Sequence, residues 1–128
     1  MDARSERNVI GVNARLVAVV RLAHQAMGER DDGLGFIVTE GLRSPIRQAE
    51  LVKAGASQTM NSRHIIGEAV DLAATVNGEV RWDWPLYPKL NVAMQSAAKE
   101  LGVVLTWGGS WKMMDGPHFQ IEPWQLQT

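Results

Sequence analysis

Residues 62–71 read Ser-Arg-His-Ile-Ile-Gly-Glu-Ala-Val-Asp and mark the point where a polar, irregular segment becomes extended. On a helix, the seven-residue spacing of His64 and Asp71 would put both side chains on one face but about 10 Å apart along the axis. Gly67 and the β-branched residues around it favour a loop carrying His64 and a strand carrying Asp71. A bend between them would bring the two side chains together.

Residues 115–121, Asp-Gly-Pro-His-Phe-Gln-Ile, contain the second half of the pattern. In a strand, His118 and Gln120 share one face, while Phe119 points to the opposite, apolar face. Strict alternation would put Asp115 on the face away from His118, but the intervening Gly-Pro breaks the strand and allows a turn. That turn can return the carboxylate to the histidine side.

Two of the chain's three histidines therefore fall in stretches that also carry aspartates. The chain has no cysteine, so His, Asp or Glu would have to hold any metal. Two histidines, one aspartate and an open position are typical of catalytic zinc, whereas a fourth protein ligand closes a structural site. Spacing alone does not separate either site from ordinary surface or hydrogen-bonded side chains. The third histidine, His24, has no ligand-spaced neighbour, and no His-Glu-x-x-His motif is present.

The hydrophobic pattern on either side of these stretches predicts a small α+β domain with a mostly antiparallel sheet and about three helices. Apolar residues at helical spacing and capping residues predict helices at residues 12–27, 45–54 and 86–101. Short apolar and β-branched runs, two of them joined by an Asn-Gly hairpin turn, predict strands at residues 36–39, 69–76, 79–82, 103–107 and 117–121.

Length and composition exclude several classes of protein. A chain of 128 residues fits one domain, and 45% hydrophobic with 21% charged residues is typical of a globular protein. The 13 basic and 14 acidic side chains leave no positive excess for binding nucleic acid. Residues 1–8 are charged and lack an apolar segment, so neither a Sec signal peptide nor membrane insertion is expected.

The sequence resembles the zinc D-alanyl-D-alanine carboxypeptidase and L-alanyl-D-glutamate peptidase family (VanY-like), and most closely its phage endolysins. Residues 62–71 are similar to the family motif Ser-x-His-x-x-Gly-x-Ala-x-Asp, and residues 115–118 to its Asp/Glu-x-x-His motif. The similarity extends over almost the whole chain and includes residues 5–8, 41–44, 47–48 and 107–111. It implies a fold like that of the DD-peptidases and the Hedgehog N-terminal domain.

The resemblance implies one Zn²⁺ ion bound by His64, Asp71 and His118, with Asp115 as the catalytic carboxylate. Asp115 would take a proton from the zinc-activated water and act as the general base. Many carboxypeptidase members have glutamate at this position, whereas endolysin-like members often have aspartate. The aspartate therefore favours the endopeptidase branch.

The candidates for substrate contact are Arg43, Ser62, Gln48 and Trp111. Arg43 matches the family's basic residue facing a substrate carboxylate, and its planar fork suits a carboxylate better than lysine does. Ser62 and Gln48 are candidates for hydrogen bonds to the substrate or to other site residues, although such residues also cap turns and helices. Trp111 or Trp107 could form a wall of the groove, with core packing as the alternative for at least one of them.

We accordingly expect a bacteriolytic endolysin that hydrolyses the L-alanyl-D-glutamate bond of peptidoglycan stem peptides and so serves host cell lysis. The alternatives are a D,D-carboxypeptidase with the same chemistry and a non-catalytic, zinc-stabilised binding module. Residues 1–128 would form one monomeric catalytic domain with no separate cell-wall-binding module. It would be made in the host cytoplasm and act on the cell wall, in the periplasm, after release by a separate protein.

Overall fold

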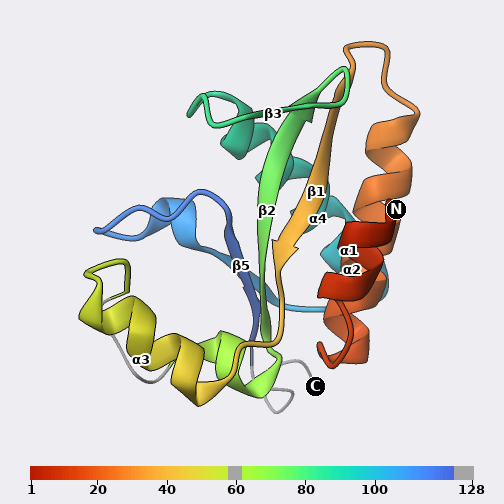
Figure 1. The fold of residues 1–128 in the computed structure, drawn as a ribbon. Helices are drawn as coiled ribbons and strands as arrows, with labels where there is room; N and C mark the ends of the chain where they lie inside the picture. The colour runs from red at the N-terminus through yellow and green to blue at the C-terminus, as the bar shows by residue number, and fades with distance from the viewer. Residues whose placement is uncertain (58–61, 123–128) are drawn as a thin grey trace.

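A five-stranded antiparallel sheet runs through the computed structural model, which describes residues 1–57 and 62–122 (Figure 1). Its strands are β1 (Leu34–Glu40), β2 (Ala69–Val76), β3 (Glu79–Arg81), β4 (Leu105–Trp107) and β5 (His118–Ile121). They lie in the order β1-β2-β5-β4, with β3 paired to β2, and every pair is antiparallel. This arrangement confirms the predicted mostly antiparallel α+β fold.

The described residues also form four α-helices: α1 (Ala3–Asn8), α2 (Ala14–Gly28), α3 (Pro45–Lys53) and α4 (Leu86–Leu101). The last three are the predicted helices. Helix α1 was not predicted, because six residues are too few to show a helical stripe. Its start is fixed by Asp2, whose side chain accepts a 2.8 Å hydrogen bond from the Ser5 amide. Within the described residues, no helix has the length and apolar character needed to cross a membrane.

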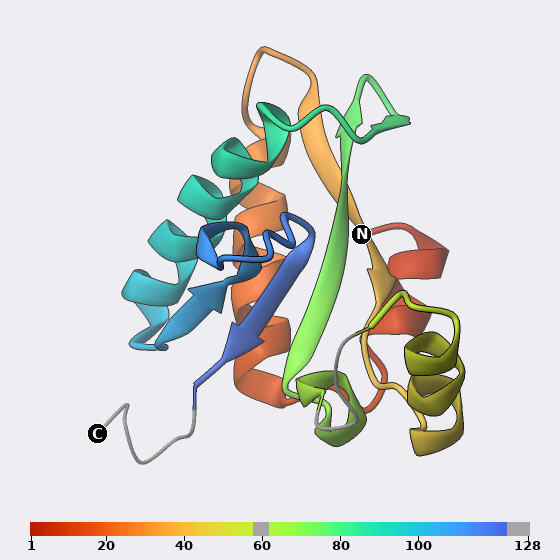
Figure 2. The same cartoon turned by 90° about the vertical axis from the view of Figure 1, so that its left-hand side faces the viewer.

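The hydrophobic core lies between the sheet and the helices α2 and α4, which cover one face of the sheet (Figures 1 and 2). Helix α2 contributes the stripe predicted from its sequence, namely Leu16, Val19, Val20, Ala23 and Met27, all buried. The sheet contributes Val70, Leu72, Ala74 and Phe119. The alternation predicted for residues 118–120 is thus confirmed, and Asp71 and His118 lie on the other face, where Leu51 of α3 lines the same cavity.

The segment before β2 differs from the predicted loop, because it contains a short 3₁₀-helix, η1 (Arg63–Ile66). Gly67 ends this helix with φ of +71°, which favours glycine, and its carbonyl accepts a 2.7 Å hydrogen bond from the Asn13 amide. A Cβ atom at Gly67 would lie 2.5 Å from the Gly11 carbonyl oxygen. Gly67 therefore permits both the turn from His64 into β2 and close packing against residues 11–13.

Gly67→Ala is expected to lower the free energy of unfolding by about 3 kcal/mol, because it adds a backbone clash to left-handed strain. Gly102 is a matched control, since it also ends a helix with positive φ, of +68°, but a Cβ atom there would meet no described atom within 4 Å. Gly102→Ala should cost only about 1 kcal/mol. Urea denaturation measures both, and equal losses would contradict the packing role of Gly67.

Candidate active site

His64 lies on η1 and is almost fully buried, at 2% exposure. The Ser62 hydroxyl accepts a 3.2 Å hydrogen bond from the His64 amide and caps this helix. The ring atom Nδ1 lies 2.8 Å from the Gly41 carbonyl oxygen. A carbonyl can only accept, so Nδ1 carries the proton and Nε2 presents its lone pair to the site.

Asp71 and His118 are direct partners across the β2–β5 pair. His118 Nε2 lies 2.9 Å from the amide oxygen of Gln120, two residues further along the same strand. Because that oxygen accepts, Nε2 carries the proton of the neutral ring and Nδ1 is left as the lone-pair atom. Each histidine is therefore oriented by a hydrogen bond on the side away from Asp71, as metal-binding histidines usually are.

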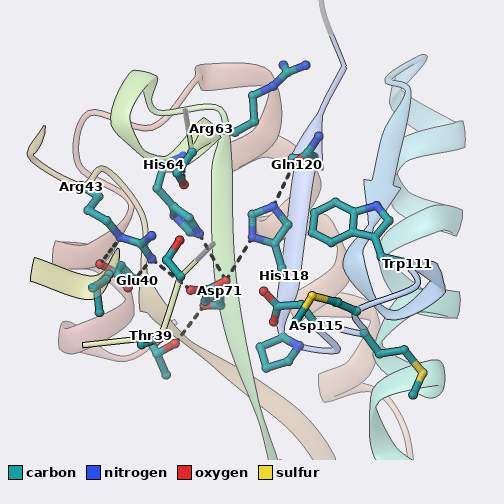
Figure 3. Close-up of a pocket in the computed structure, with 18 of the residues that line it drawn as sticks. Thr39, Glu40, Arg43, Arg63, His64, Asp71, Trp111, Asp115, His118 and Gln120 are labelled. Carbon is teal, nitrogen blue, oxygen red and sulfur yellow. Dashed lines mark hydrogen bonds and ion pairs between the residues drawn. The ribbon is translucent and has the colours of Figure 1, made fainter. Parts of the chain in front are cut away.

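The three side chains meet at one point (Figure 3). Asp71 Oδ1 lies 3.3 Å from His64 Nε2 and 3.4 Å from His118 Nδ1. The buried atoms His64 Nε2 and Asp71 Oδ1 have no hydrogen-bond partner among the described residues. Zinc bonds of about 2.0–2.1 Å in tetrahedral geometry set ligand atoms about 3.3 Å apart. The spacing, and the lack of hydrogen-bond partners for these two buried atoms, therefore fit a bound metal ion.

Close contact between Asp71 and His118 shifts the pKa of both side chains. Burial on its own would raise the pKa of Asp71, but the His118 and His64 rings outweigh it and hold that pKa below its ordinary value. Burial likewise opposes the charged form of His118, and the Asp71 carboxylate overcomes this and raises the pKa of His118. The site thus stabilises positive charge beside Asp71, as a cation-binding site should.

Asp115 lies beside these residues but outside the possible ligand group, which among the described residues consists of His64, Asp71 and His118. Its amide donates to Gly108 O at 2.9 Å, and its carbonyl accepts from the His118 amide at 3.1 Å. This is the predicted turn through Gly-Pro. Partial burial, and then the negative charge of Asp71, raises the pKa of the Asp115 carboxyl.

All four residues line a cavity of about 970 Å³ on the face of the sheet opposite the core. Arg43, Ser62 and Trp111 also line it, as expected for substrate contacts, and their roles stay predictions. Gln48 lies elsewhere: it is fully buried and its side-chain oxygen accepts a 2.7 Å hydrogen bond from Arg43 Nη1. The structure therefore places Gln48 as a support of Arg43.

The two tryptophans considered for the groove have different positions. Trp111 is 38% exposed, and its ring centroid lies 5.0 Å from that of the His118 ring, so Trp111 forms a wall next to the site. Trp107 packs against the core, stacks on Trp84 and donates a 2.7 Å hydrogen bond to the Gly116 carbonyl. Trp107 thus holds the turn between Asp115 and His118.

Gln120 and Glu40 also belong to the site, and the sequence predicted no role for either of them. Gln120 orients His118, and its position on the same strand face was the available signal. Glu40 lines the cavity and forms an ion pair with Arg43, at 2.7 Å. Strict alternation after the buried Val38 would have pointed Glu40 into the core, so the pattern gave no signal for it.

Known proteins resemble this chain in both fold and sequence, and the structure of one of them has been solved. The crystal structure of the Serratia marcescens L-Ala D-Glu endopeptidase ChiX superposes with a TM-score of 0.87 at 46% identity. The match covers 100% of this chain and 93% of that one. The L-alanyl-D-glutamate peptidase of Escherichia phage T5 is 29% identical over 122 residues, which cover 92% of this chain and 85% of the relative.

Two longer proteins match over part of their length. The L-alanyl-D-glutamate peptidase of Listeria phage A118 is 34% identical over 91 residues, or 70% of this chain and 31% of the relative. The peptidoglycan L-alanyl-D-glutamate endopeptidase CwlK of Bacillus subtilis is 33% identical over 107 residues, or 71% of this chain and 63% of the relative. This chain thus spans about a third of the first and under two thirds of the second. The family model of the phage L-alanyl-D-glutamate peptidases matches residues 1–123, and the chain belongs to that family.

Proposed function

We propose that this protein is a zinc-dependent peptidoglycan peptidase that hydrolyses the L-alanyl-D-glutamate bond of stem peptides. The observation that carries the proposal is that two buried atoms without a hydrogen-bond partner, His64 Nε2 and Asp71 Oδ1, lie at zinc-ligand spacing beside the carboxylate of Asp115. Membership of the family supports the choice of bond. A purely structural metal site needs no carboxylate next to it, which disfavours the non-catalytic module.

His64, Asp71 and His118 would hold the zinc ion, which supplies a water of lowered pKa and polarises the scissile carbonyl. Asp115 takes the proton from the attacking water and passes it to the leaving amine. Its raised pKa suits this role, because a base works best when its pKa lies nearer the working pH. No covalent link between the protein and the substrate is required.

The stem peptide would lie in the cavity, with Trp111 as one wall and Ser62 near the histidine end. Residues 1–128 would act as one catalytic domain and as a monomer, without a nucleic-acid partner. As expected for a phage endolysin, the protein would be made in the host cytoplasm and reach the cell wall after release. Its biological effect would be lysis of the host cell.

Digestion of purified sacculi followed by mass spectrometry tests the proposal. We expect fragments ending in the carboxyl group of L-alanine together with peptides starting at D-glutamate. A chelator should abolish them and added Zn²⁺ restore them. Loss of only a terminal D-alanine would establish the D,D-carboxypeptidase instead, and metal-dependent binding of sacculi without cleavage would establish the binding module.

A further inference from the structure

An irregularity in β1 brings a second carboxylate to the metal centre. Val38 pairs with Leu72, but Glu40 pairs with Asp71, so Thr39 is an extra residue in the ladder. Without this bulge, Glu40 would point into the core like Val38. With it, Glu40 shares the face of its cross-strand partner Asp71 and lines the same cavity.

Two carboxylates in opposed positions repel each other, and Arg43 lies between them (Figure 3). Its Nε and Nη2 atoms each donate a 2.7 Å hydrogen bond to Glu40, and Nη1 donates one to Gln48. The same Nη2 atom lies 3.6 Å from Asp71 Oδ2. Arg43 is only 8% exposed, so its guanidinium is fixed in this position by three hydrogen bonds.

The two oxygens of Asp71 are thereby given different surroundings. Oδ2 faces the guanidinium of Arg43, while Oδ1 faces the two histidine nitrogens. The Thr39 hydroxyl also donates a 3.2 Å hydrogen bond to the Asp71 carbonyl and fixes the backbone there. The carboxylate is thus turned to offer one oxygen to a metal ion.

This arrangement also limits what Arg43 can offer a substrate. A guanidinium has five N–H groups. Three of them donate to Glu40 and Gln48, which leaves one N–H on Nη1 and one on Nη2. Nη2 is the atom that lies at ion-pair distance from Asp71. The Nε–Nη2 side of the fork, which could grip a carboxylate with two parallel hydrogen bonds, is occupied by Glu40.

We propose that Glu40 is a positioning residue of the metal centre, which acts through Arg43 to keep Asp71 Oδ1 directed at His64 and His118. This role rests on the proposed function, since it presumes that the centre binds zinc. Glu40 balances the charge of Arg43 and holds the guanidinium at ion-pair distance from Asp71. Without that balance, the guanidinium is drawn to Asp71 and competes with the metal for its carboxylate.

Glu40→Gln tests this role, because it removes the charge and keeps the shape. The affinity of the metal-free protein for Zn²⁺, measured by competition with a chromophoric chelator, should fall about 10- to 100-fold. After saturation with Zn²⁺, kcat on cell-wall peptide should fall with little change in KM. Glu50→Gln is the matched control, since Glu50 forms an exposed ion pair with Arg47 on α3 and lies outside the cavity. It should change neither value.

A double variant shows whether Glu40 acts through Arg43. If it does, Glu40→Gln/Arg43→Met should bind Zn²⁺ no more weakly than Arg43→Met alone, whereas independent effects would multiply. The proposal would be overturned by an unchanged Zn²⁺ affinity in Glu40→Gln, or by losses of Zn²⁺ affinity that multiply in the double variant. A Glu40→Gln variant in which only KM rises would overturn it as well. Such a rise in KM would indicate that Arg43 binds the substrate, as the sequence predicts. A wild-type protein that binds no Zn²⁺ would instead overturn the proposed function, and this role with it.

Discussion

Asp115→Asn should lower kcat about 10²- to 10⁴-fold, because the amide cannot take a proton from the attacking water. Asparagine keeps the size of the side chain. The turn is held by two backbone hydrogen bonds, from the Asp115 N–H to the Gly108 carbonyl and from the His118 N–H to the Asp115 carbonyl, and neither involves the carboxylate. Zn²⁺ affinity should therefore stay close to that of the wild type. Single-turnover kinetics on a defined stem peptide and a chelator competition measure the two effects separately.

Asp31→Asn is the control for the loss of one negative charge, since Asp31 is exposed in the segment between α2 and β1. It should leave both turnover and Zn²⁺ affinity unchanged. An Asp115→Asn variant that keeps wild-type kcat would remove Asp115 from the reaction. A variant that loses its Zn²⁺ would instead make Asp115 part of the metal centre.

Local pattern was sufficient to predict the elements that carry the candidate site. Alternation in residues 117–121 correctly separated Phe119 on the core side from His118 and Gln120 on the polar side, because one face of this sheet packs against helices and the other faces the cavity. It could not predict which residues of two strands stand opposite each other. That Asp71 pairs with both Glu40 and His118 depends on the register of three strands.

The contacts of Arg43 show where sequence reasoning stops. An arginine in a family motif suggested a substrate carboxylate, but its partners are a glutamate displaced by a bulge and a glutamine from α3. A bulge is defined by the pairing of two strands, so the hydrophobic pattern of one strand alone does not reveal it. Helix α1 was missed for a related reason, since its capping bond and its packing on β1 specify it more than its six-residue pattern does.

His64→Ala should have the other large effect, a loss of Zn²⁺ affinity of more than about 100-fold together with loss of turnover. Removing a metal ligand should lower Zn²⁺ affinity more than removing a residue that only supports a ligand, which costs about 10- to 100-fold in metal affinity. In the wild type, Zn²⁺ at about 100 times its dissociation constant should stabilise the fold by about 2.7 kcal/mol. His64→Ala should lose this Zn²⁺-dependent rise in Tm, measured by calorimetry with and without the ion.

His24→Ala separates the role of the metal from the loss of a histidine. His24 packs edge-on against Phe36 at 5.4 Å, on the core side of the sheet, so its replacement should lower Tm but keep the full Zn²⁺-dependent rise. A rise retained by His64→Ala would remove this residue from the metal centre. Asp115→Asn should keep the Zn²⁺-dependent rise in Tm but lose turnover. These results together distinguish a catalytic zinc centre from a structural one, because a protein with a purely structural centre would have no activity for the Asp115 variant to lose.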